Sequence, residues 1–542
     1  MGKPGFSRRS VLKGAALGGV GAVGLAVPLG GSLRAKAAST LARNQLPTPY
    51  QRAFALPPVL SPYDRQVVTT GQTSVTTEYY ELSQRAGTTQ IAPGIQTPIW
   101  GYDGIFPGPM ISVEQGTRSV PRVRNKLPDT HPQFGHEFHT STHLHGSASK
   151  PQYDGYANDL TPPHFYKDYQ YPNNQAARTI WYHDHKVHHT ALNVYTGLVA
   201  FYRIHDPLER ALLPQGEFDV PLMVSDAILG PDGSLLYQDN THSGLWGDII
   251  LVNGVPWPVM KVKPRIYRFR VLDASIGRSY RFTLSNGAPI WVVGTDGGLM
   301  PAAQQVSQWR HGQAERYEVL VDFRGYPPGT SIELLNLSNK NNVGYDHTGK
   351  VMRFDVVAAD AWSDDGSTID SIPTVLNPDE PTMALVKTGS MRKRNFRLHR
   401  VGTVWMINGE TWDDVVVSSF QHVQANPDLN DVEVWTIENK GGGWFHPTHI
   451  HLIDFQVLSR NGRPPHPWER GPKDVVYVGE GEKVELIMKF GPHRGRYMMH
   501  CHNLPHEDHD MMTQFSVGYS SGNPDPDDPI GADPCRYDDL PD

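Results

Sequence analysis

The sequence predicts an all-β protein with about three consecutive domains, on three observations. The chain has 542 residues, and domains usually contain about 100 to 200 residues. It carries 52 glycines and 45 prolines, a turn-rich composition typical of proteins built from short strands. Segments such as residues 73–82, 110–113 and 198–204 alternate apolar and polar side chains between Gly and Pro turns, which is the pattern of half-buried strands.

Charge and apolar content narrow the class of protein. The chain has 49 basic and 56 acidic residues, a net charge of -7, and no strongly basic block, so nucleic-acid binding is not expected. Its apolar content of 38% can fill several cores. After the N-terminal segment no apolar run is long enough to span a bilayer. We therefore expect a soluble mature chain without a stable membrane anchor.

Residues 1–37 carry an export pattern. F-S-R-R-S-V-L-K at residues 6–13 resembles a twin-arginine signal, an uncharged run follows over residues 14–32, and A-K-A at 35–37 offers small residues for cleavage. A membrane anchor is the alternative, but the run is rich in Gly and Ala and only moderately apolar. We expect the twin-arginine machinery to export the folded chain to an extracytoplasmic site, secreted or in the periplasm or cell envelope, in a bacterium or archaeon.

The remaining chain divides at changes in composition. A Pro-rich lead over residues 38–62 precedes a first domain at 63–207 and a second at 208–359. The second domain contains the alternating segments W-G-D-I-I-L-V-N-G and P-R-I-Y-R-F-R-V-L-D-A-S but no pair of histidines. A polar linker at 360–394, a third domain at 395–517 and an acidic tail at 518–542 complete the chain.

Four His-x-His pairs are the strongest chemical signal. They occur in T-H-L-H-G, W-Y-H-D-H, H-P-T-H-I-H and M-H-C-H. If each segment is extended, the two imidazoles of a pair lie on one face. The eight histidines are His143, His145, His183, His185, His449, His451, His500 and His502. Imidazole binds copper, zinc, iron or nickel, so the pairs alone leave the metal open.

The last pair brackets Cys501, and the thiol would project from the face opposite to the two imidazoles. His506 and Met511 follow at five-residue steps. Cys, His and a distant Met are ligands of blue-copper sites, which need one more His. A lone buried Cys is more often a small hydrophobic residue, but the four histidine pairs favour a metal. If Cys501 binds copper, Cys535 has no partner within the chain and no internal disulfide is expected.

These four segments, two near each end of the chain, resemble the copper-binding motifs of the multicopper oxidases. The branch of bilirubin oxidases and bacterial spore-coat laccases is the most similar. H-C-H-N-L-P-H-E-D-H-D-M-M, W-F-H-P-T-H-I-H-L-I-D-F and H-L-H-G-S carry the match. The resemblance implies three consecutive cupredoxin-like Greek-key β-barrel or sandwich domains. In that family the first and third domains hold copper, and the middle domain is a spacer without copper.

The resemblance also implies four copper ions and a role for each ligand. His446, Cys501 and His506 match the equatorial ligands of the type 1 copper, and Met511 matches its axial ligand. His143 and His449 match the type 2 ligands. The type 3 pair would be held by His145, His183, His185, His451, His500 and His502. An electron would pass from the Cys501 thiolate along the backbone to the flanking histidines.

The implied activity couples four one-electron oxidations of organic donors to the reduction of dioxygen to water. Phenols, aromatic amines and bilirubin-like tetrapyrroles are the expected donors, with electrons entering near His506. Glu507 and Asp154 match acidic positions that assist proton delivery in the laccase branch, although Asp154-Gly155 is also a turn dipeptide. Trp444, two residues before His446, either lines the donor pocket or packs in the core.

Two other functions stay open. A metallo-oxidase would act on Mn(II), Cu(I) or Fe(II). The chain has 14 methionines but no Met-rich cluster in the third domain, which disfavours the Cu(I) version. A non-catalytic cupredoxin-like protein would lack ligands, and none of the twelve is missing here. Four further histidines near the motifs, His164, His188, His189 and His509, are expected beside the ligands or at the surface.

Overall fold

The computed structural model describes residues 38–238, 242–358, 367–518 and 536–537. Strands dominate the described residues and form six sheets, so the all-β prediction is confirmed. The α-helices among them are short: α1 (Thr190–Thr196), α2 (Pro207–Leu212), α3 (Trp412–Val417) and α4 (Leu504–Asp508). Single 3-10 turns are η1 (Pro151–Tyr153), η2 (Gly216–Phe218) and η3 (Pro467–Glu469). None of the described helices is long and apolar enough to cross a membrane.

The first two sheets come from residues 64–205, called here the first segment. One contains β1 (Asp64–Thr70), β2 (Thr73–Thr89), β3 (Thr97–Tyr102), β5 (Arg118–Asn125) and β7 (Phe165–Asp168). The other runs in the order β4 (Ile111–Glu114), β9 (Val199–His205), β8 (Arg178–Asp184) and β6 (Thr142–His145). Apolar side chains such as Ile180 and Tyr202 are fully buried within a core of this segment.

The next two sheets come from residues 219–356, the middle segment. The larger runs in the order β12 (Val255–Pro256), β11 (Ile249–Val252), β10 (Asp219–Ala227), β14 (Ile266–Asp273), β19 (Arg316–Asp322), β16 (Ile290–Thr295) and β17 (Gly298–Val306). The smaller runs in the order β13 (Val259–Val262), β21 (Lys350–Val356), β20 (Ser331–Asn336), β15 (Tyr280–Leu284) and β18 (Gln308–His311).

The last two sheets come from residues 393–517, the third segment. One runs in the order β23 (Val404–Ile407), β22 (Lys393–Val401), β24 (Val432–Asn439), β28 (Lys483–Lys489) and β26 (Phe455–Arg460). The other runs in the order β27 (Val475–Val478), β25 (His446–Ile450), β29 (Gly495–Cys501) and β30 (Met512–Val517). Buried apolar side chains of this segment, such as Trp435 and Leu486, form a core of their own.

The expected strands are present with shifted ends. β2 continues to Thr89, seven residues beyond the predicted stretch, because it pairs in turn with β1, β5 and β3. The acidic tail contributes one described strand: β31 (Arg536–Tyr537) pairs antiparallel with β7. β7 would otherwise be the edge of its sheet, and an edge strand offers unpaired backbone groups to any extended segment nearby. The export signal and Cys535 lie outside the described residues.

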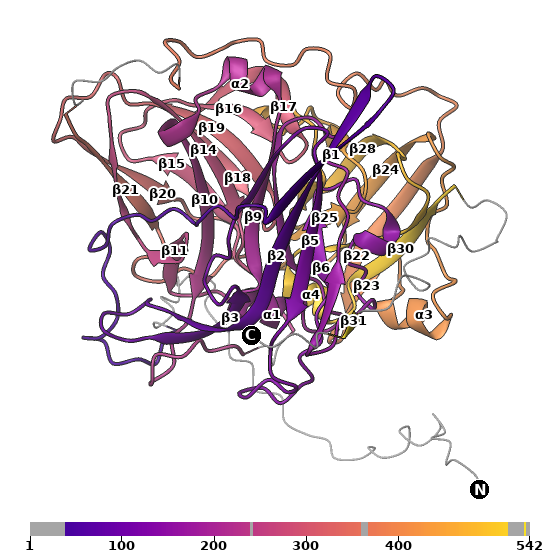
Figure 1. The fold of residues 1–542 in the computed structure, drawn as a ribbon, viewed down its shortest axis with the longest axis horizontal. Coiled ribbons are helices and arrows are strands. Elements are labelled where there is room, and N and C mark those ends of the chain that lie inside the picture. Colours follow the sequence, from indigo (N-terminus) through magenta and orange to yellow (C-terminus); the bar gives the residue numbers. More distant parts are fainter. Residues whose placement is uncertain (1–37, 239–241, 359–366, 519–535, 538–542) are drawn as a thin grey trace, which may run out of the picture. The chain divides into compact units, whose positions relative to one another are not determined.

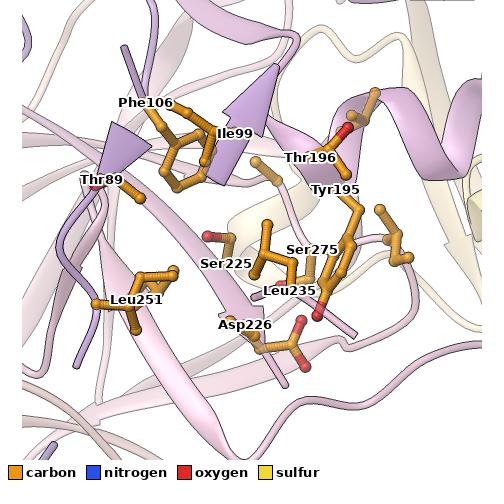
Figure 2. Close-up of a pocket in the computed structure, with 15 residues that line it drawn as sticks. Thr89, Ile99, Phe106, Tyr195, Thr196, Ser225, Asp226, Leu235, Leu251 and Ser275 are labelled. Carbon is orange, nitrogen blue, oxygen red and sulfur yellow. The ribbon is translucent and has the colours of Figure 1, made fainter. Parts of the chain in front are cut away.

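Two hollows lie away from the histidine pairs. A cavity of about 20 Å³ lies between the first and middle segments. Tyr195 of α1 and Asp226 of β10 are among the side chains that line it (Figure 2). It has room for about one water molecule. A groove of about 680 Å³ runs along the lead segment, between Tyr50 and Met260. No lining residue of either hollow is one of the twelve candidate ligands.

Candidate metal centres

The four His-x-His pairs sit on two pairs of adjacent strands. β6 and β8 are antiparallel neighbours with His143 opposite His183, and β25 and β29 are antiparallel neighbours with His449 opposite His500. Alternate residues of a strand share one face, so each strand pair presents its imidazoles together. β6 and β25 (Figure 1) are far apart in the sequence, but the rings of His145 on β6 and His449 on β25 are stacked.

The eight imidazoles of these pairs form one buried group, which we call the eight-histidine cluster. Each of its members is at most 1% exposed. Ring centroids of His145 and His449 lie 3.7 Å apart, those of His185 and His500 4.8 Å apart, and those of His145 and His502 5.1 Å apart. The structure therefore brings together the four histidines of the first segment and the four of the third.

Several ring nitrogens in the cluster have no hydrogen-bond partner among the described residues. They include Nε2 of His143, His183 and His449 and Nδ1 of His145. The Nε2 atoms of His185 and His451 lie 3.2 Å and 3.1 Å from Nε2 of His500. Buried polar atoms normally find a partner. Converging nitrogen lone pairs of this kind fit metal ions, and imidazole suits copper.

In three histidines of the cluster, a hydrogen bond from one ring nitrogen determines which nitrogen keeps its lone pair. Nδ1–H of His143 donates to the carbonyl of Asp154 at 2.5 Å, that of His183 to Asp184 at 2.8 Å, and that of His449 to Asp474 at 2.9 Å. These bonds fix the tautomer and leave Nε2 with its lone pair, as is common for metal-binding histidines. Burial and neighbouring imidazoles also lower the pKa of His143 and His449 well below the usual value, which keeps both rings neutral.

Both predicted acidic residues lie against the cluster. Oδ2 of Asp154 accepts a hydrogen bond from Nδ1 of His451 at 2.8 Å. Oε2 of Glu507 lies 2.8 Å from Nδ1 of His500, and its Oε1 lies 3.6 Å from Nδ1 of His185. Burial raises the pKa of Asp154 well above its usual value. Burial also opposes ionisation of Glu507, but the neighbouring His500 and His185 outweigh it and lower its pKa to about 2.

A second candidate centre joins His446, Cys501 and His506. Nδ1 of His446 lies 3.3 Å from the Cys501 sulfur and 3.2 Å from Nδ1 of His506, and the sulfur lies 3.7 Å from Nδ1 of His506. All three side chains are fully buried. Nε2–H of His506 donates to the carbonyl of Ser243 at 3.0 Å, so its Nδ1 carries the lone pair. We call this the Cys501 centre.

The Cys501 centre fits a copper ion. Burial raises the pKa of the Cys501 thiol well above its usual value, so a thiolate there needs a cation beside it. Two neutral imidazoles and one thiolate are the equatorial ligand set of a blue-copper site. Met511 is fully buried in the same core as Cys501; its N–H donates to the His506 carbonyl at 2.9 Å and its carbonyl accepts from Cys501 N–H at 3.1 Å.

The surroundings of His506 include groups that the sequence did not point to. The Trp405 ring stacks on the imidazole of His506 at 3.7 Å, and Trp444 meets it edge-on at 5.6 Å. The guanidinium of Arg400 lies 4.8 Å above the Trp405 ring. Trp444 packs against the core around Cys501 but is only partly buried. Its position is therefore compatible with both expected roles, lining the donor pocket and packing in the core. Ser243 comes from the middle segment and belongs to none of the sequence motifs described above.

Asp474 is another residue that sequence reasoning missed. Its Oδ1 lies 3.2 Å from Nε2 of His145 and 3.7 Å from Nδ1 of His449.

The four further histidines lie outside both centres. Among them, His188 donates to the carbonyl of Asp508 at 3.0 Å, and His509 stacks on His242 at 3.5 Å. His164 contacts Asp129, and the His189 ring lies 4.3 Å from that of His136.

Comparisons with known proteins agree with this chemistry. Two family models, both described as multicopper oxidase, match residues 84–209 and 376–521. A bilirubin oxidase from Albifimbria verrucaria is 40% identical over 481 residues, which cover 85% of this chain and 80% of the relative. A laccase from Bacillus subtilis (strain 168) is 34% identical over 496 residues, covering 81% of this chain and 94% of the relative. The crystal structure of McoA multicopper oxidase from the hyperthermophile Aquifex aeolicus has a TM-score of 0.74 and 28% identity, and the match covers 87% of this chain and all of that one.

Proposed function

Because this chain belongs to the multicopper oxidase family, we propose that its twelve candidate ligands hold four copper ions. One ion would be bound at the Cys501 centre by His446, Cys501 and His506, with Met511 as its axial ligand. Three would be bound by the eight-histidine cluster, with His143 and His449 at the type 2 ion. The unpartnered buried nitrogens of the cluster, next to a Cys–His–His centre, are the observation that carries this proposal.

The chain is a copper-dependent oxidoreductase, and dioxygen is its electron acceptor. When bound, the four copper ions would each take up one electron, and the four electrons together would reduce one dioxygen. Four protons are also consumed, and two waters form. The protein connects the two centres through its own backbone, because Cys501 belongs to one centre and its neighbours His500 and His502 to the other.

Asp154 and Glu507 are the proposed proton-handling groups. Both carboxyl groups are nearly inaccessible to solvent and lie within 2.8 Å of an imidazole nitrogen of the cluster. A buried acid this close to the reacting site can pass protons to oxygen without admitting bulk water. Asp154 is in contact with His451, and Glu507 with His500, so the two acids approach the cluster through different histidines.

Organic molecules are the proposed electron donors, as the names of the related bilirubin oxidase and laccases indicate. His506 is fully buried beneath Trp405 and the Ser243 carbonyl. A donor would therefore approach the Cys501 centre over the partly exposed indole of Trp444, because Trp405 is itself fully buried. Flat aromatic donors stack favourably on an indole ring such as that of Trp444, and Arg400, which lies over the neighbouring Trp405, adds a positive charge nearby.

Oxygen uptake by the copper-loaded enzyme tests this proposal. Bilirubin, 2,6-dimethoxyphenol, Cu(I) and Mn(II) should be compared at matched concentrations, with apoprotein as the control. We expect uptake with the organic donors, at four donor electrons per dioxygen. Uptake confined to a metal ion would make the protein a metallo-oxidase, and no uptake by copper-loaded protein would make it a non-catalytic relative.

We also propose that residues 1–37 direct twin-arginine export and are then removed, which places the enzyme outside the cytoplasm. The arginine pair at Arg8 and Arg9 supports this proposal. Fractionation of an expressing bacterium should show the wild-type chain outside the cytoplasm, with an N-terminus close to Ala38. Replacing both arginines by lysine should retain the chain in the cytoplasm. Unchanged export of that variant would refute the proposal.

A further inference from the structure

The carboxyl group of Asp474 contacts histidines from both ends of the chain. Its Oδ1 accepts a hydrogen bond from Nε2 of His145 at 3.2 Å and lies 3.7 Å from Nδ1 of His449. Its backbone carbonyl accepts from the same Nδ1 at 2.9 Å. With Nε2 of His145 engaged, Nδ1 is that ring's free nitrogen, whereas His449 keeps Nε2 free. Asp474 therefore selects opposite nitrogens in two neighbouring rings.

Arg316, the first residue of β19 in the middle segment, holds this carboxyl group. Its Nη1 donates to Oδ1 of Asp474 at 2.7 Å and its Nη2 to Oδ2 at 2.5 Å, a bidentate pair. Its remaining donor contacts go to the carbonyls of Thr179, Ala314 and Asp296 at 3.0, 3.0 and 3.1 Å. Arg316 is fully buried, and it contacts the first, middle and third segments at once.

A second residue of the middle segment holds the backbone on either side of Asp474. Oδ2 of Asp296 accepts from the N–H groups of Asp474 and Val475 at 3.3 and 3.2 Å and lies 2.9 Å from Nζ of Lys473. Its Oδ1 accepts from the N–H of Arg316 at 2.7 Å. Both the side chain and the backbone of Asp474 are thus fixed by the segment that has no candidate metal ligand.

The Arg316–Asp474 pair packs closely against the backbone at Gly146. Gly146, next to His145, has φ +90°, and a Cβ there would lie 2.6 Å from Nη2 of Arg316 and 2.8 Å from Oδ2 of Asp474. The pair is thus pressed against the backbone that carries His145. A side-chain contact that is both bidentate and tightly packed fixes the angle of the group it holds.

We propose that Arg316 is a positioning residue for the copper ions of the eight-histidine cluster. By holding Asp474, it fixes the orientation and tautomer of His145 and the position of His449. This inference rests on the proposed copper binding at the cluster. Arg270 shows what a structural arginine looks like by contrast: it is equally buried on the adjacent strand β14, but its partners Asp219, Glu318 and Glu209 contact no candidate ligand.

The test compares Arg316→Met with Arg270→Met, since both remove one buried, ion-paired guanidinium. Each variant is loaded with copper and titrated with a chelator, and the type 1 and type 2 signals are followed separately by electron paramagnetic resonance. For Arg316→Met we expect about 10- to 100-fold weaker retention of type 2 copper, the usual effect of losing a partner behind a metal ligand, and full retention of the type 1 signal. Arg270→Met should leave the ratio of type 2 to type 1 copper retention unchanged.

Two outcomes would overturn the positioning role. One is type 2 retention by Arg316→Met as tight as in the wild type. The other is loss of type 1 and type 2 copper in equal proportion from a folded variant, which would mean that Arg316 has no selective effect on the cluster. If Arg316→Met does not fold, Asp474→Asn keeps the side-chain volume and should show the same selective loss. A wild-type protein that binds copper only at the Cys501 centre would refute the proposed function itself.

Discussion

The Cys501 centre and the eight-histidine cluster share strand β29 but are assembled in different ways. All four candidate ligands of the Cys501 centre come from residues 446–511, within the third segment. The cluster takes four histidines from β6 and β8 and four from β25 and β29. One centre therefore takes its ligands from a single segment, whereas the ligands of the other come together only when two distant segments dock.

Ion pairs that are largely removed from solvent connect the segments. Arg178 of the first segment pairs with Asp454 of the third at 2.9 Å, and Arg316 of the middle segment pairs with Asp474 of the third. Buried ion pairs add little net stability, but removing one partner is costly because the other charge is left uncompensated. Such pairs specify one arrangement of the segments, and the cluster needs that arrangement more than the Cys501 centre does.

Cys501→Ser is the change expected to separate the two centres most completely. The alcohol replaces the only thiolate ligand, so the blue absorption and donor oxidation should be lost altogether. Copper in the eight-histidine cluster should stay bound, because no cluster histidine is altered. Copper analysis and absorption spectra measure both effects. Continued oxidation of organic donors by this variant would show that electrons do not enter at Cys501.

Glu507→Gln should impair the cluster alone. The amide keeps the volume of the side chain beside His500 but cannot carry a proton. We expect turnover to fall by about 10²- to 10⁴-fold, the usual contribution of a positioned acid or base. Reduction of the type 1 copper by donor in the absence of oxygen should keep its wild-type rate in stopped-flow measurements. An equal loss in both rates would remove Glu507 from proton delivery.

Arg178→Ala should weaken the docking of the first segment on the third. The variant leaves Asp454, which is 17% exposed, without its partner, so we expect a loss of stability against denaturant smaller than the about 3–5 kcal/mol typical of a fully buried pair. Cluster copper should be lost at a lower denaturant concentration than type 1 copper. Arg324→Ala, which removes a more exposed pair with Asp322, is the matched control and should have little effect. Simultaneous loss of both kinds of copper would show that the segments do not dock independently.

Met511→Leu is expected to give the smallest effect, confined to the Cys501 centre. The thioether is a soft ligand that stabilises oxidised copper, so its removal should raise the type 1 potential. A rise on the order of 60 mV would correspond to a tenfold change in the one-electron equilibrium. Redox titration of the blue band measures the shift. A fall in potential would exclude Met511 as the axial ligand.

The sequence could predict the features that depend on residues close together in the chain. Strand alternation and turn composition were enough for the all-β fold, which is confirmed. The motif around Cys501 and the four histidine pairs indicated the family, which the comparisons confirm. A strand with alternating His, Cys and His records its chemistry locally, because neighbouring residues point to fixed faces. The ligand roles of individual residues stay predictions.

The missed residues act across long sequence separations. Arg316 and Asp474 are 158 residues apart, and Ser243 and His506 are 263 residues apart. An arginine or aspartate inside a strand has the same local pattern whether it pairs with a carboxylate, a ligand or solvent. Only the docked sheets show that the middle segment, expected as a spacer, supplies contacts to both centres.

An anomalous-scattering map from crystals of the copper-loaded protein, recorded at the copper absorption edge, would locate every bound ion. We predict four peaks: one between His446, Cys501 and His506, and three among the imidazoles of the eight-histidine cluster. A single peak at the Cys501 centre, or copper bound away from these twelve residues, would show that the two centres proposed here are not the copper sites of this protein.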